Sequence, residues 1–128
     1  MTDRITALRA LLEAVEAGTL DGRFDPHFER ALYPIAKTMA PVYWAGEAYH
    51  LASLDAAKAL HEAVLGDGYI GSGFKYVIWG SGKASVWHVI TGHEGFGEVN
   101  EKGIHGVCQA RAWLCAILRA LISMEEEG

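Results

Sequence analysis

The sequence has few of the residues that would cross-link the chain or anchor it in a membrane. It contains only two cysteines, and Cys108 and Cys115 lie two helical turns apart, a separation of roughly 10 Å that is too long for a disulfide. No run approaches the roughly 18 consecutive apolar residues of a membrane span. The first residues, Met1–Ile5, lack the basic-then-apolar order of a signal peptide. We therefore expect a reduced, cytoplasmic protein with no membrane segment.

Positive charge is also scarce. The chain has 11 basic residues against 16 acidic ones and a formal net charge of -5. The basic residues are scattered and form no stripe that would follow a phosphate backbone, which argues against nucleic-acid binding. An acidic surface suits a protein partner better.

The length of 128 residues, of which about half are apolar, is sufficient for one folded unit with its own core. We expect a single domain over residues 1–124. The acidic residues Glu125–Glu127 would follow the negative end of a helix dipole, so residues 125–128 are expected to form a disordered acidic tail.

Apolar residues at helical spacing predict about four helices. Two of them have clear start signals: Asp25 and Pro26 suit the cap and first position of one helix, and Ser53 suits the cap of another. The expected helices span Asp3–Ala17, Asp25 to about Pro41, Leu54–Leu65 and Val107–Met124. The aromatic segment Val42–Leu51 is expected to be a linker lying on the core.

A change of pattern after the third helix predicts strands. Phe74–Trp79 and Ala84–Ile90 flank a Gly-Ser-Gly turn, which is typical of an antiparallel hairpin around residues 74–90. A short third strand is expected near Phe96–Val99. Because both faces of the hairpin carry large apolar residues, we expect helices on both sides. The predicted fold class is α+β, with a small antiparallel sheet packed between helices as an α/β/α sandwich.

Three features resemble a known family. They are the capped helix that contains Ser53-Leu54-Asp55-Ala56-Ala57, the Trp-bearing hairpin, and the Ala/Cys/Leu-rich segment Ala112–Leu121. Together they resemble small bacteriophage and prophage proteins, in particular the phage ABA sandwich domain, over roughly Tyr43–Ile122. The resemblance implies a helix/sheet/helix sandwich and a phage-type accessory protein in the cytoplasm of a bacterial host. It implies no catalytic residues and no cofactor.

Histidines and carboxylates offer one alternative site. His88, His93, Glu94 and His105 fall at the end of the hairpin and in the loop that follows, and these residue types supply lone pairs for transition metals. Their spacing matches no known metal motif. They are interpreted either as exposed loop residues or as the site of a small ligand-binding or metal-binding domain, which would then be open to enzymatic chemistry.

Two other patterns point less to chemistry. His50 precedes Ser53, but helix capping explains the serine and no orienting acid is evident. The glycine-rich run Gly66–Gly73 leaves a helix and enters a strand, whereas a phosphate-binding loop leads from a strand into a helix. We therefore assign no catalytic residue and no cofactor.

Tryptophan and tyrosine carry the main functional hypothesis, because they dominate protein cores and also interface hot spots. Four tryptophans exceed what one small core usually requires. We predict a non-enzymatic protein-binding or self-associating module, such as a homodimer formed through the hairpin or the last helix. A virion or assembly component is a further alternative. The interface candidates are Tyr43, Trp44, Tyr76, Trp79, Trp87 and Trp113.

Overall fold

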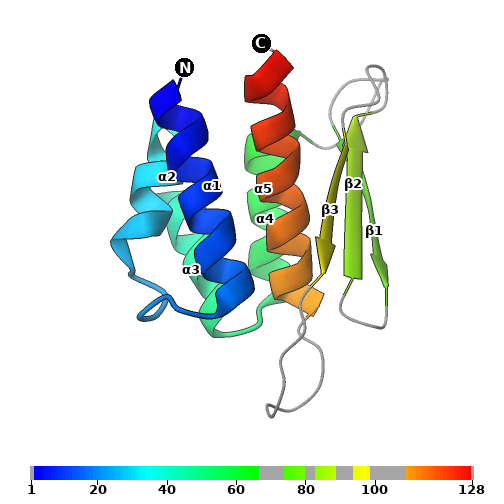
Figure 1. Ribbon diagram of the computed structural model, residues 1–128. Helices are drawn as coiled ribbons and strands as arrows, with labels where there is room; N and C mark the ends of the chain where they lie inside the picture. The colour runs from blue at the N-terminus through cyan, green and yellow to red at the C-terminus, as the bar shows by residue number, and fades with distance from the viewer. Residues whose placement is uncertain (1, 67–73, 80–82, 89–93, 99–108, 128) are drawn as a thin grey trace.

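The computed structural model describes residues 2–66, 74–79, 83–88, 94–98 and 109–127 (Figure 1). These residues are mostly helical, with five helices and one antiparallel sheet of three strands. In chain order the elements are α1 (Thr2–Ala17), α2 (Pro26–Ala36), α3 (Ala40–His50), α4 (Leu54–Leu65), β1 (Phe74–Trp79), β2 (Lys83–His88), β3 (Glu94–Glu98) and α5 (Gln109–Glu127).

Local capping explains where the middle helices begin and end. The Asp25 carboxylate accepts a hydrogen bond from the His27 N–H at the start of α2, and the Ser53 hydroxyl accepts one from the Ala56 N–H at the start of α4. Each cap satisfies one of the N–H groups that a helix start leaves free. Lys37, with φ of 63°, ends α2 in the left-handed conformation.

The core is centred on α5, which lies next to the sheet (Figure 1). Helix α4 reaches the sheet as well, because the His61 ring lies 4.9 Å from the Tyr76 ring of β1. Every residue of α5 from Ala112 to Leu118 is buried, so this helix is apolar around its whole circumference. A helix of that kind can pack against neighbours on opposite sides. It contacts β2 and β3 on one side, and α1, α3 and α4 elsewhere.

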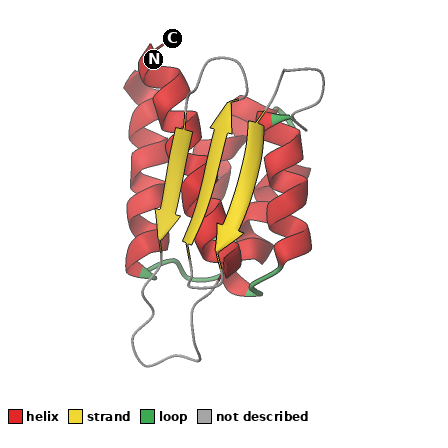
Figure 2. Ribbon diagram, turned by 90° about the vertical axis from the view of Figure 1, so that its right-hand side faces the viewer, coloured by secondary structure: helices red, strands yellow, loops and turns green. Residues whose placement is uncertain are grey.

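The strands pair in the order β1-β2-β3, with Tyr76 opposite Val86 and Ser85 opposite Phe96. Ala84 and Val86 of the central strand are fully buried. Their face of the sheet is turned toward α5. Figure 2 shows the sheet in front of the helices, all of which lie behind that one face.

The expected α/β/α sandwich is therefore wrong. The expected number of helices is also wrong, since the described residues form five. The helices that should have covered the second face of the sheet instead pack together with α5 behind the first face, and the all-round apolar surface of α5 receives α1, α3 and α4. The sandwich implied by the phage resemblance is wrong for the same reason.

The linker expected over Val42–Leu51 is wrong as well, because this segment belongs to α3. The sequence pattern predicts that Pro41 ends a helix, but Pro41 lies in the first turn of a new one, where its missing N–H costs nothing. Buried Ala45, Ala48 and Tyr49 turn one side of α3 toward the core.

The acidic C-terminal residues do not form a separate tail. Glu125 and Glu126 belong to α5, and they pair with Arg4 and Arg9 of α1. The Arg4 and Glu125 side chains are 3.1 Å apart. These ion pairs give the end of α5 partners that the sequence pattern did not indicate. None of the helices in the described ranges is long and apolar enough to cross a membrane.

Candidate interaction surface around Phe24

The loop between α1 and α2 displays an aromatic ring to solvent. The Phe24 side chain is 69% exposed, and it meets the half-exposed Tyr43 of α3 edge-to-face, with ring centroids 6.1 Å apart. The Arg23 guanidinium lies 4.8 Å from the centre of the Phe24 ring. Both contacts have geometries in which aromatic rings attract their partners. We call these residues, with Glu29 and Glu47 beside them, the Phe24 surface.

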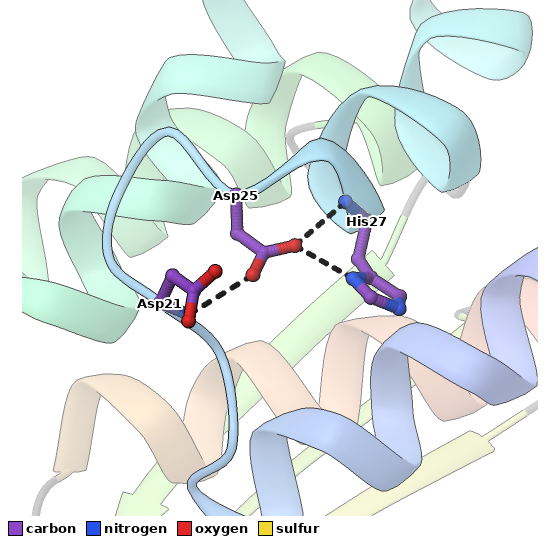
Figure 3. Close-up of polar contacts among 3 residues, drawn as sticks. All are labelled: Asp21, Asp25 and His27. Carbon is purple, nitrogen blue, oxygen red and sulfur yellow. Dashed lines mark hydrogen bonds and ion pairs between the residues drawn. The ribbon is translucent and has the colours of Figure 1, made fainter.

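One carboxylate, that of Asp25, joins the two ends of the loop (Figure 3). The Asp25 side chain is almost fully buried and accepts hydrogen bonds from the backbone N–H groups of Asp21 and His27, each at 2.9 Å. The His27 Nδ1 lies 2.6 Å from the same carboxylate. Because Asp25 binds groups on both sides of Phe24, it fixes the loop across the exposed ring.

These contacts also set the charge state of Asp25. Burial of the carboxylate raises its pKa, but hydrogen bonds from the Asp21 and His27 N–H groups, together with the His27 side chain, more than offset burial. The net effect lowers the pKa of Asp25 from its ordinary 3.8 to about 2. The carboxylate is therefore ionised at neutral pH and accepts its hydrogen bonds at full strength.

Helix α3 packs closely against the backbone of the same loop, at Gly46. A Cβ atom added to Gly46 would lie 1.9 Å from the Arg23 carbonyl oxygen, where real Cβ atoms essentially never come within 3.0 Å. Only a glycine lets α3 approach the Arg23 backbone this closely. The segment that presents Phe24 is thus fixed by Asp25 and by Gly46.

Shallow depressions surround the exposed ring. One has a volume of about 410 Å³, and it is lined by Asp21, Gly22, Arg23, Phe24, Asp25, Pro26 and His50. Two others of about 220 Å³ each lie beside Tyr43, one lined partly by Glu47 and the other by Glu29, Met39 and Val42. The lining combines apolar residues with the carboxylates of Asp21, Glu29 and Glu47, beside the single arginine Arg23. This composition suits a partner segment with an apolar side chain and positive charge.

The other predicted interface residues lie in different surroundings. Tyr43 belongs to the Phe24 surface, whereas Trp44 is partly buried against the core. Trp113 is only 2% exposed, and its ring is 4.3 Å from Tyr76 and 5.9 Å from His61. Trp113 is therefore a core residue, and the last helix offers no exposed aromatic face for self-association.

Two of the predicted interface residues and two of the candidate metal ligands belong to the sheet. Trp79 and Trp87 belong to β1 and β2. His88 pairs with Phe74 while Glu94 pairs with Trp87, so the strand register assigns His88 and Glu94 to opposite faces.

His93 and His105 lie outside the described residues. Within the described ranges, no three histidine, cysteine, aspartate or glutamate side chains are close enough to hold a metal ion.

Sequence reasoning missed Phe24, although a signal was present. Phe24 directly precedes the capping residue Asp25, a position from which an apolar side chain usually packs against the fourth helical residue. That residue here is Glu29, so the usual apolar partner is absent. An apolar residue at this position without its usual partner is a signal for an exposed anchor.

Comparison of the chain with family models, curated proteins and solved structures found no match in any of the three.

Proposed function

We propose that this protein is a protein-binding module whose Phe24 surface receives an extended segment of a partner protein, with an apolar side chain next to basic residues. One observation carries the proposal: the Phe24 ring is 69% exposed although the loop that presents it is fixed on both sides. A ring held in water by a rigid loop contributes little to folding. Its burial by a partner would contribute about 1.5–3 kcal/mol.

Preorganisation makes this ring a suitable anchor. Binding usually costs free energy because side chains and loops must be ordered at the interface. Here Asp25 and Gly46 already fix the backbone, and Tyr43 and Arg23 already contact the ring. Phe24 can therefore form an interface without a large ordering cost, and the aromatic and arginine composition matches that of binding hot spots.

The charges around Phe24 support a basic partner segment. Glu29 and Glu47 line the two depressions beside Tyr43, while the Arg23 guanidinium lies over the Phe24 ring. A lysine or arginine next to the partner's apolar anchor would be attracted to these carboxylates. Such rim charges mainly increase the association rate and make binding sensitive to salt.

The test is selection of peptides from a random display library on the purified protein. We expect selected sequences with an apolar anchor flanked by lysine or arginine. Their affinity should fall at least tenfold in Phe24→Ala and Tyr43→Ala, which remove about 2 kcal/mol of apolar contact. Tyr33→Ala is the matched control, because Tyr33 and Tyr43 are both 44% exposed and Tyr33 lines none of the three depressions.

The charge part of the proposal has its own readout. Glu47→Gln should weaken binding of a selected peptide, and raising the salt concentration should reduce the difference between this variant and the unmodified protein. Selected peptides that bind Phe24→Ala and Tyr43→Ala as tightly as the unmodified protein would refute the proposed function. Selection of acidic rather than basic sequences would refute the charge argument.

A further inference from the structure

The Phe24 and Tyr43 rings form two walls of an exposed corner. Their planes are nearly perpendicular, with an interplanar angle of 85°, and both side chains are open to solvent. Two depressions of about 220 Å³ each include both rings in their lining. Pockets for drug-sized ligands usually measure roughly 300–1,000 Å³, so each depression suits the end of one side chain. We call Phe24, Tyr43 and the residues that line these two depressions the aromatic corner.

The two rings are suited to attract a cation. The faces of an aromatic ring carry partial negative charge, and the angle between two perpendicular rings gives access to a face of each. A cation within about 6 Å of a ring centre is attracted to it. The chain itself uses this property at Phe24, since the Arg23 guanidinium lies 4.8 Å from the ring centre. The Phe24 ring remains 69% exposed despite that contact, so it retains surface for a second cation.

The charges in the lining also favour a cation. Three carboxylates line the two depressions, those of Asp25, Glu29 and Glu47. They outnumber the Arg23 guanidinium in the same lining. Glu47 is half-buried, and a charge in such a position is screened less by salt than one in open water. The positive charge of Arg23 therefore does not exclude a further cation.

The aromatic walls select the kind of cation. The ammonium group of an unmodified lysine is compact and strongly hydrated, and aromatic faces do not replace the hydrogen bonds that it loses on leaving water. N-methylation removes N–H donors and adds apolar surface, while the positive charge remains. A methylated ammonium therefore loses less hydration on contact with the rings. Quaternary ammonium groups are accordingly the usual ligands of sites built from several aromatic rings.

We propose that the aromatic corner binds the trimethylated side chain of a lysine in the partner segment. This inference rests on the proposed function, because it specifies the basic residue that the partner brings to the Phe24 surface. The trimethylammonium group contacts the Phe24 and Tyr43 rings, and the carboxylates of the lining balance its charge. An arginine of the partner is less suited, since its guanidinium keeps five N–H donors that need acceptors.

A titration with capped amino acids, followed by nuclear magnetic resonance, tests the inference. The probes are N-acetyl-lysine methylamide, its Nζ-trimethylated form, and an uncharged analogue in which carbon replaces the nitrogen of the trimethylammonium group. We expect the trimethylated probe to shift the amide signals of residues 21–25 and 43–47, and to bind more tightly than each of the others by roughly threefold or more. Comparison with lysine isolates the methyl groups, and comparison with the uncharged analogue isolates the charge.

Substitutions that remove a ring separate cation binding from general apolar contact. Phe24→Leu and Tyr43→Leu keep an apolar side chain, and each should abolish the preference for the trimethylated probe over the uncharged analogue. Tyr43→Phe keeps the ring and should keep that preference. Tyr33→Leu is the matched control, because Tyr33 and Tyr43 are equally exposed and Tyr33 lines neither depression. Circular dichroism confirms that each variant is folded.

Selected peptides distinguish failure of this inference from failure of the proposed function. A peptide that loses affinity in Phe24→Ala, yet binds no more tightly when its lysine is trimethylated, would leave the proposed function in place and overturn the inference. A trimethylated probe that binds no more tightly than lysine or the uncharged analogue would overturn it as well. So would a preference for the trimethylated probe that persists in both Phe24→Leu and Tyr43→Leu.

Discussion

Replacement of Gly46 by alanine should destabilise the protein, although the general helix rule predicts the opposite. Gly46 lies in the interior of α3, where alanine normally stabilises a helix by roughly 0.5–1 kcal/mol relative to glycine. Here the new Cβ would lie 1.9 Å from the Arg23 carbonyl oxygen and within 3.0 Å of two further Arg23 backbone atoms. Helix α3 and the loop must therefore separate by about 1 Å.

Overpacking of this kind costs about 1–3 kcal/mol and outweighs the gain in helix propensity. We expect a net loss of about 1–2 kcal/mol in the free energy of unfolding, and a thermal midpoint lower by roughly 3–8 °C for a domain of this size. Because the displaced atoms belong to Arg23, the same variant should bind selected peptides more weakly.

Thermal and urea unfolding followed by circular dichroism measure the effect. Ala63→Gly, at an exposed position of α4, calibrates the contribution of helix propensity and should cost about 1 kcal/mol. If Gly46→Ala raised the thermal midpoint, the close approach of α3 to the Arg23 backbone would be wrong. The Asp25 hydrogen bonds would then be the one remaining contact described here that fixes the loop.

Four further substitutions test the contacts around the loop and the core. Asp25→Ala should cost about 1–2 kcal/mol in thermal unfolding, because it removes the cap of α2 and the acceptor for the Asp21 N–H, and Ser53→Ala should cost about 1 kcal/mol or less. Asp25→Asn should be less stable than the unmodified protein by about 1–2 kcal/mol above pH 4. That difference in stability should shrink between pH 4 and pH 2, because the lowered pKa of Asp25 stabilises the fold only while its carboxylate is ionised. A stability difference that does not depend on pH would contradict this contribution of the Asp25 carboxylate. Arg111→Met should cost about 1–2 kcal/mol in the free energy of unfolding. The Arg111 Nε donates to the Tyr49 carbonyl oxygen at 2.9 Å, and the guanidinium lies 4.1 Å from the centre of the Tyr49 ring. Unchanged urea unfolding would refute the contribution of these contacts.

Local signals were sufficient to predict several helices. Ser53 and Gly66 mark the two ends of α4, and the bounds expected from them are those of the structure. Asp25 and Pro26 likewise mark the start of α2. These signals are reliable because capping depends on neighbours in the sequence.

Predictions that depended on the tertiary arrangement were wrong. Pro41 can end one helix or begin the next, and only packing against the core decides between the two. The sandwich prediction was wrong because apolar residues on both faces of a strand do not indicate which element packs against each face. The phage-type setting stays a prediction from the resemblance alone.

The candidate site was only partly predictable for the same reason. Tyr43 is one of six aromatic candidates, and aromatic composition alone does not show that Tyr43 is half exposed while Trp113 is buried. Phe24 becomes an exposed anchor only because α3 and Asp25 fix its loop. Such exposure arises from contacts between segments about 20 residues apart, which local pattern analysis does not capture.

Binding of a partner segment on the Phe24 surface can be measured by isothermal titration of one selected peptide into the unmodified protein, Tyr43→Ala and Tyr33→Ala. We expect Tyr43→Ala to lose at least tenfold in affinity while Tyr33→Ala binds like the unmodified protein. Equal affinities for Tyr43→Ala and the unmodified protein would show that the Phe24 surface is not the binding site.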